Sequence, residues 1–198
     1  IQRALNRGAK LIVIDPIKTE FASRADIHLQ LEPEHNIPVI NALLYTIIEE
    51  GLVNEEFVRD HTIGIEYVKE AVKDYAPEVV AKYTRLNPED IRAAARMYAT
   101  TKPAVITHGM GVTHFNHGVG GVCDVSNLFL ITGNICELGT GDLPLRGQEN
   151  VQGCCDMGVL PNIFPNLGSV TDPEQRAWFE KMWHLEPGFL NSKIGIHK

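Results

Sequence analysis

Three short apolar segments along the chain predict β-strands. The segment GAKLIVIDP (8–16) is a continuous apolar run rich in β-branched residues, which is typical of a strand buried on both faces of a parallel sheet. The segment PAVITHG (103–109) has the same character and ends in a glycine. The segment ADIHLQLEP (25–33) instead alternates apolar and polar positions, which predicts a second, more exposed strand.

Most of the remaining chain carries signals for helices. Asn54 and Asn87 precede acidic first turns, where capping residues usually stand, and Thr171 or Asp172 takes that place in the last segment. A helical pattern is interrupted near Pro77. The predicted helical segments are residues 36–51, 54–61, 64–84, 87–103, 122–134 and 171–183.

This order of elements predicts the fold class. Strand, helices, strand and helix follow one another as in half of a doubly wound α/β domain. We therefore predict an α/β fold with a Rossmann-like, mostly parallel sheet flanked by helices. The pattern fails over residues 133–158, which are rich in glycine and almost without periodicity. A loop longer than about 12–15 residues inside a domain is usually functional, so this segment is a candidate site.

Composition and charge narrow the classes of partner. The chain has 198 residues and a formal net charge of -7, which argues against a nucleic-acid partner or an anionic membrane surface. We find no apolar run of the roughly 20 residues that a membrane-spanning helix needs. The opening IQRALNRGAK lacks a Met and resembles the end of a helix already in progress, so we expect a longer parent chain.

The four cysteines do not form a metal-binding pattern. Cys123, Cys136, Cys154 and Cys155 show no CxxC spacing, and they are too few for a disulfide scaffold. We expect buried or partly buried thiols in a reducing compartment.

Candidate chemistry follows the predicted strands, because ligands of open α/β sheets bind beyond the carboxyl ends of the strands. Asp15 would accept a hydrogen bond from a ribose or a guanine edge, or would only cap the next turn. Thr19 could donate to a phosphate. Gly109 and Gly111 permit close approach of the backbone to a phosphate.

Two further groups of polar residues offer chemistry of their own. His114 and His117 stand three positions apart and suggest either a metal pair or hydrogen-bonding side chains; no acid or cysteine completes a metal set nearby. Arg146 lies between a leucine and a glycine and offers a planar fork for a carboxylate or a phosphate. Gln148 and Asn150 add amides, so this stretch predicts a polar pocket that handles an anion.

Four segments together give the chain a family resemblance: VIDPIKTEFASRADIHLQL, HGMGVTHFNHG, LITGNICELGTG and PLRGQENVQGCCDMGVLPN. They resemble the catalytic subunit of molybdenum- or tungsten-dependent formate dehydrogenases, in the DMSO-reductase family of molybdopterin oxidoreductases. The resemblance runs from about residue 8 to residue 167. It implies oxidation of formate to carbon dioxide, or the reverse, at a metal held by two molybdopterin guanine dinucleotides.

The resemblance also implies roles for particular residues. Arg146 matches the arginine that holds formate beside the metal, and no metal ligand is implied within the chain. One domain would span residues 1–148 and bind a dinucleotide, and residues 149–198 would begin the next. The cofactor-binding positions implied are Ile14, Asp15, Pro16, Thr19, Leu31 and Asn36 at the guanosine end, Gly109, Met110, Gly111 and His114 under the pterin and pyrophosphate, and Gly147 and Gln148 beside the cofactor.

Several parts that such an enzyme needs would lie outside these 198 residues. They are a 4Fe–4S cluster in a preceding segment, a selenocysteine or cysteine that ligates the metal, and a further cofactor-covering domain. We therefore expect no formate turnover from this chain alone, and an electron-accepting subunit or carrier as a partner of the parent protein, in the cytoplasm. Two alternatives stay open: another molybdopterin oxidoreductase acting on nitrate or a different oxo-anion, and a cofactor-binding module without catalysis.

The chain also departs from the common pattern of the family at four places. They are Ile17 where an arginine is common, Glu34-His35-Asn36 where Gly-x-Asp is common, His114 where a glutamine is frequent, and Glu149 where an asparagine is frequent.

Overall fold

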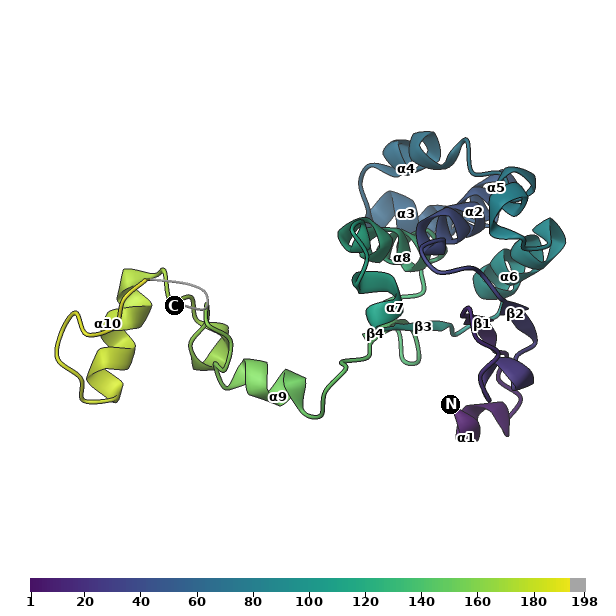
Figure 1. Ribbon diagram of the computed structural model, residues 1–198. Helices are drawn as coiled ribbons and strands as arrows, with labels where there is room; N and C mark the ends of the chain where they lie inside the picture. Colours follow the sequence, from purple (N-terminus) through teal and green to yellow (C-terminus); the bar gives the residue numbers. More distant parts are fainter. Residues whose placement is uncertain (193–198) are drawn as a thin grey trace. The chain divides into compact units, whose positions relative to one another are not determined.

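The computed structural model describes residues 1–192 and divides into two units (Figure 1). The first unit comprises Ile1–Leu145 and the second Arg146–Lys198. Within the described residues no helix is long and apolar enough to cross a membrane.

The strands of the first unit are all parallel. Strand β1 (Ile12–Ile14) pairs with β2 (Ile27–Leu29), and β3 (Val105–His108) pairs with β4 (Gly141–Pro144). Within residues 1–192 these pairs are two separate two-stranded sheets. Parallel strands combined with helices confirm the predicted α/β class, since parallel strands need crossover connections.

The predicted burial of the first and third strands on both faces is wrong. Ile14 is 36% exposed and Val105 is 46% exposed, whereas Ile12 and Ile106 pack against the hydrophobic core. Figure 1 shows that the larger helices of this unit, α2 to α6 and α8, lie on one side of the strands. An apolar run therefore gave the correct element without revealing how many of its faces are covered.

Helices make up most of the first unit, and local signals start several of them. The Asn54 side chain accepts a hydrogen bond from Phe57 N at 3.1 Å, and the Asn87 side chain accepts one from Glu89 N at 3.0 Å, so both predicted caps are confirmed. Pro77 begins a helix of its own. The helices are α1 (Gln2–Leu5), η1 (Ala22–Arg24), α2 (Asn36–Glu49), α3 (Glu55–His61), α4 (Ile65–Val72), α5 (Pro77–Thr84), α6 (Pro88–Thr100), α7 (Met110–Thr113) and α8 (Gly118–Thr132).

Helix α2 lies at the centre of the hydrophobic core. Its Val39, Leu44 and Ile47 are fully buried, and the helix packs against α5, α6 and α8. Burying each such side chain contributes about 1.5–3 kcal/mol. At the rim of this packing, Arg92 on α6 forms ion pairs with Glu49 at 2.7 Å and with Glu78 at 2.9 Å, and so links three helices.

Helix α8 begins four residues earlier than its apolar pattern predicted, at Gly118. A Cβ added at Gly118 would lie 2.3 Å from Thr113 O, and one at Gly121 would lie 3.2 Å from the Val112 side chain. Glycine is therefore required where α8 passes close to α7. Glycine is a poor helix former, and for this reason the apolar pattern did not predict that the helix begins at Gly118.

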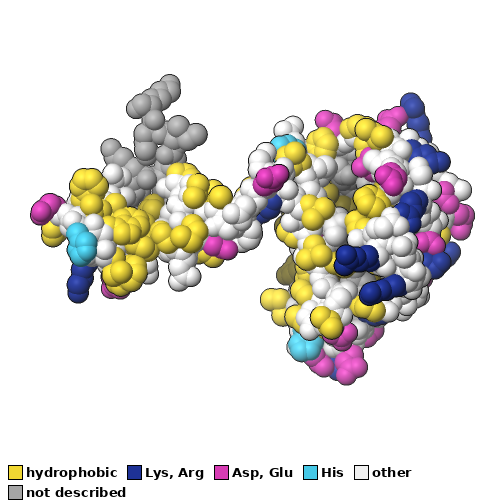
Figure 2. All heavy atoms as spheres, turned by 90° about the horizontal axis from the view of Figure 1, so that it is seen from below, with side chains coloured by type: hydrophobic (Ala, Val, Ile, Leu, Met, Phe, Trp, Pro, Cys, Tyr) yellow, Lys and Arg dark blue, Asp and Glu magenta, His cyan; other side chains and the backbone are white. Residues whose placement is uncertain are grey.

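The second unit holds less regular structure around a small core. It contains α9 (Val151–Asp156), η2 (Pro165–Leu167) and α10 (Pro173–Met182). Asp172 caps α10 by accepting from Glu174 N at 2.8 Å, which selects it over Thr171 as the cap. The core consists of Phe164, Val170 and Phe179. Figure 2 shows many hydrophobic side chains on the surface of this unit. The large hydrophobic side chains that are exposed in this unit include Trp178, Met182, Trp183 and Phe189.

The expectation of an irregular segment at 133–158 is wrong in two places. Residues 141–144 form strand β4, and residues 151–156 form helix α9. The sequence GDLP has little strand propensity of its own, so pairing with β3 determines the conformation there.

Candidate functional site

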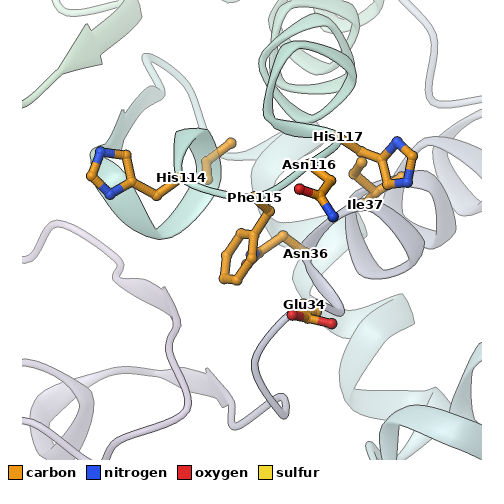
Figure 3. Close-up of a pocket in the computed structure, with 8 residues that line it drawn as sticks. Glu34, Asn36, Ile37, His114, Phe115, Asn116 and His117 are labelled. Atoms are coloured by element: carbon orange, nitrogen blue, oxygen red, sulfur yellow. The ribbon is translucent and has the colours of Figure 1, made fainter.

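A pocket of about 310 Å³ lies in the first unit, where the start of α2 meets the segment around α7 (Figure 3). Polar side chains of several kinds face it alongside three apolar ones. The residues that line it are Glu34, Asn36, Ile37, Val112, His114, Phe115, Asn116 and His117.

Asn36 joins the two halves of this pocket. It is the first residue of α2, and its side-chain Nδ2 donates to Gly111 O at 2.7 Å, across 75 positions of sequence. This bond fixes the segment after β2 against the segment after β3. Two of the predicted cofactor positions, Asn36 and His114, therefore line one pocket, and Gly111 is bonded at its edge.

The connection from β2 to α2 is held by packing and charge. Glu34 has a φ of 73°, a left-handed backbone that non-glycine residues seldom adopt. The neighbouring His35 ring packs on Tyr83 of α5 with 5.9 Å between ring centroids. Glu32 forms an ion pair with Arg85 at 2.9 Å. These contacts hold the Glu34 carboxylate at the pocket.

The two histidines of the pocket do not act as a pair. Figure 3 shows the His114 and His117 rings pointing in opposite directions from the loop that carries them. Residues 1–192 contain no group of three His, Cys, Asp or Glu side chains that could hold a metal ion. The geometry favours hydrogen-bonding histidines over a metal pair.

Five lining residues were not predicted as site residues: Glu34, Ile37, Val112, Phe115 and Asn116. Glu34 had been noted only as a departure from the family pattern. Phe115 and Asn116 lie inside the motif HFNH, between the two histidines that were its candidate residues. His117 had been weighed but not assigned to the cofactor. The only signal in the sequence that could have identified these residues is the high proportion of polar residues in the segments that follow the strands.

The predicted positions around the end of β1 lie on the surface and outside the pocket. The Asp15 side chain accepts from Ile17 N at 2.7 Å, so it caps the turn that follows it. The Thr19 hydroxyl accepts from Ala22 N at 3.2 Å. Pro16 is also exposed, and its carbonyl accepts from Gln30 at 3.1 Å, which ties this turn to the segment after β2.

Leu31 differs from the other predicted cofactor positions because its side chain is buried in the hydrophobic core. Contact with a ligand would therefore involve its backbone. Ile14, at the end of β1, is by contrast exposed enough for its side chain to touch a ligand.

The predicted phosphate loop follows β3 directly. Gly109 precedes α7, and a Cβ at this position would lie 3.2 Å from Leu145 O. Met110 is half exposed, and a Cβ added at Gly111 would have no neighbour within 4 Å. The loop is therefore closely packed at its first residue and open at the next two.

Arg146 begins the second unit, and Gly147 and Gln148 follow it. All three residues are exposed. A guanidinium carries five N–H donors, and its exposure leaves that of Arg146 open to solvent.

Parallel strands under a layer of helices, with a polar pocket beside the segments that follow two strands, define an α/β protein suited to binding a polar cofactor. Residues 1–175 match the family model described as molybdopterin oxidoreductase. The chain belongs to the molybdopterin oxidoreductase family.

Individual relatives agree with this assignment. The chain is 45% identical over 196 residues to the F420-dependent formate dehydrogenase subunit alpha of Methanocaldococcus jannaschii, covering 99% of this chain and 28% of that protein. It is 45% identical over 183 residues to formate dehydrogenase H of Escherichia coli, covering 92% of this chain and 26% of that protein. The chain thus spans about a quarter of the length of these relatives.

A solved structure shows a similar fold. Acetylene hydratase from Pelobacter acetylenicus matches with a TM-score of 0.68 and 33% identity, over 70% of this chain and 19% of that one.

Membership of the family implies a molybdopterin cofactor with molybdenum or tungsten. The pocket fits a part of such a group. It offers amides, imidazoles and one aromatic ring, and its volume of about 310 Å³ lies at the lower end of the range for ligand pockets. A whole dinucleotide is larger, so the pocket would hold one portion of it.

Proposed function

We propose that this chain is the part of a formate dehydrogenase catalytic subunit that binds a molybdopterin guanine dinucleotide. The observation that carries the proposal is the hydrogen bond from Asn36 to Gly111 O. It brings the segments after two strands together at one pocket, and both segments contain cofactor positions implied by the family resemblance. The 45% identity with formate dehydrogenases supports the choice of substrate.

The charges and hydrogen-bonding groups of the pocket suggest which part of the cofactor would lie near which side chain. The backbone of Gly109 to Gly111 and the ring of His114 suit a pyrophosphate or a pterin edge, because they donate hydrogen bonds. The carboxylate of Glu34 would repel a phosphate and suits the N–H donors of a base or pterin ring. A phosphate is therefore expected nearer His114 than Glu34.

The guanosine end is proposed to lie along the exposed turn after β1 and the segment after β2. Asp15 already accepts from Ile17 N, and a carboxylate has lone pairs for further donors. Thr19 and the backbone of Leu31 complete this surface, together with Ile14 and Pro16. Gly147 and Gln148 are proposed to contact the cofactor beside Arg146.

Arg146 is proposed to bind formate. The chemistry that the bound cofactor supplies is acceptance of the two electrons released as formate becomes carbon dioxide and a proton. Formate has two equivalent carboxylate oxygens, and a guanidinium fork can donate to both at once. Arg146 would thereby neutralise the substrate's charge and fix the direction of its C–H bond, which contributes to catalysis through orientation.

The remaining assignments are proposals of the same kind. They are a second dinucleotide on another domain, a 4Fe–4S cluster in a preceding segment of the parent protein, and an electron-accepting subunit or carrier. The F420-dependent relatives bear the name "subunit alpha", which supports a multisubunit assembly. A cytoplasmic location stays a prediction.

Formate-dependent reduction of a viologen dye by the full-length protein tests this proposal. The variant Arg146→Lys keeps the charge and removes the fork, so we expect kcat/KM for formate to fall about 100-fold. Arg59→Lys changes an exposed arginine on α3 in the same way and should alter the rate less than about twofold.

Two results would overturn the proposal in different ways. Metal-loaded protein that ignores formate but turns over nitrate or another oxo-anion would keep the family and change the substrate. Binding of the guanine dinucleotide without turnover of any substrate in a panel would favour a cofactor-binding module.

A further inference from the structure

His108 and Asp142 form a buried hydrogen-bonded pair between neighbouring strands. His108 is the last residue of β3, and its Nε2–H donates to Asp142 Oδ2 on β4 over 3.2 Å. Their side chains are 7% and 19% exposed. Neither residue lines the pocket described above, and neither has a role in the proposed function.

The backbone of His108 makes a second bond at the same place. Leu145 N donates to His108 O at 2.6 Å, one position beyond the end of β4. The next residue, Gly109, lies so close to Leu145 that a Cβ would be 3.2 Å from Leu145 O. His108 therefore holds β4 and the residue beyond it through both its carbonyl and its ring, at the point where the two strands end.

The pair lies in polar but enclosed surroundings. Burial is the main cause that raises the pKa of the Tyr98 phenol to about 12, and the charge of Asp142 makes a smaller contribution in the same direction. Among residues 1–192, His108 Nδ1 and Asp142 Oδ1 are buried and have no hydrogen-bond partner. Each ring or carboxylate thus depends on the other for its one hydrogen bond within the described part of the chain.

Such a pair contributes more to geometry than to stability. Taking a carboxylate and an imidazole out of water is unfavourable, and apolar side chains of similar volume often stabilise a fold equally well. A directional bond between two side chains does constrain where two strands lie relative to each other, because it is satisfied at only one separation and register.

We propose that His108 and Asp142 are a positioning pair, which fixes the loop Gly109–Gly111 and the residue Leu145 where β3 and β4 end. The significance of the two segments rests on the proposed function, in which the loop binds the cofactor and Leu145 leads into Arg146. The positioning itself does not depend on what these segments bind.

Hydrogen–deuterium exchange of the full-length protein, without formate, tests the pair. Asp142→Val keeps a side chain suited to a strand and removes the acceptor. The amides of Val112, which donates to Gly109 O, and of Leu145, which donates to His108 O, should therefore exchange about tenfold faster. Asp142→Asn keeps an oxygen that can accept from His108 Nε2–H, and its exchange should stay close to that of the unchanged protein. Amides of α2 serve as the internal control and should not change.

Substitutions of His108 on β3 test the same hydrogen bond from the side of the donor. His108→Phe should accelerate exchange in the same two segments, whereas His108→Gln retains an N–H donor and should restore slow exchange at least in part. This pair of variants decides the matter if Asp142→Val does not fold.

Three outcomes would overturn the proposal. They are unchanged exchange in both segments, faster exchange spread equally through α2 and α6, and Asp142→Asn behaving like Asp142→Val. Because exchange requires neither formate nor turnover, failure of the formate assay would leave this result standing, and failure of the exchange test would leave the formate assay untouched.

Discussion

Asp124 on α8 shows how burial acts on a single charged group. Burial raises the pKa of its carboxyl from 3.8 to about 6. The folded protein therefore binds this proton more tightly than the unfolded chain does. Its contribution is most favourable below about pH 4 and is lost as the pH rises towards 6, where the buried group must ionise.

Replacing this carboxyl should consequently stabilise the protein near neutral pH. We expect Asp124→Asn to raise the free energy of unfolding at pH 7 by about 1–2 kcal/mol, allowing for partial exposure, and to have little effect at pH 4. Urea denaturation at both pH values measures this. Asp74→Asn, at an exposed position, is the control, and an Asp124→Asn effect of equal size at both pH values would contradict the prediction.

Residue-scale predictions from sequence succeeded where the determinants are local. The caps Asn54 and Asn87 require only a side chain and the next turn of backbone, which the sequence states directly. Glu34 and Asn116 required knowledge of how α2 meets α7, and no local pattern contains that information.

At the scale of elements, the end of α8 depends on a glycine in a crowded place. Gly133 has a φ of 66°, and a Cβ there would lie 2.7 Å from the Asn54 side chain that caps α3. Gly51 follows α2 with a φ of 65°, and a Cβ there would meet nothing within 4 Å. The two glycines thus share a backbone conformation and differ in their surroundings.

This difference can be measured as a difference in stability. Gly51→Ala should cost about 1–2 kcal/mol from backbone strain alone. Gly133→Ala should cost at least about 1 kcal/mol more, because it also displaces the capping side chain of Asn54. Equal losses in urea denaturation would show that Asn54 moves aside freely.

The elements that sequence reasoning missed are those that depend on a neighbour. Strand β4 lacks β-branched residues, and helix α9 contains a glycine and two cysteines in six residues. Strand β4 is formed by its pairing with β3. The spacing of apolar residues within β4 contains no information about this pairing, so the sequence pattern did not predict the strand.

At the scale of the whole molecule, the two units differ in the size of their cores. The first unit surrounds α2 with many buried aliphatic side chains, whereas the second is built on Phe164, Val170 and Phe179. Three buried side chains do little to offset the conformational entropy of some 45 residues.

Limited proteolysis of the chain should follow this difference. We expect trypsin to cleave at Arg146 and Lys181 before it cleaves at Arg92 or Arg96, whose guanidinium groups are held in ion pairs on α6. Mass spectrometry of the early products measures the order. Simultaneous cleavage at all four sites would mean that the two units unfold together.

The α/β class itself was predictable because continuous apolar runs and helical periodicity alternate along the chain. The burial of each strand could not be predicted, because an apolar run does not indicate whether one face or both faces of the strand are covered. The predicted domain boundary at residue 148 stays a prediction, as do the roles of the site residues.

The register of β3 and β4 also determines how many residues the chain can have between Gly141 and Leu145. Each residue of a strand advances it by roughly 3.3 Å and turns its side chain to the opposite face. Deleting one residue within 141–145 would therefore shift the residues that follow it by one position along the strand and turn Asp142 or Leu145 away from His108. The exposed residues 136–139 precede β4, so a peptide tag or a fluorophore inserted there should leave the contacts of His108 with Asp142 and Leu145 unchanged.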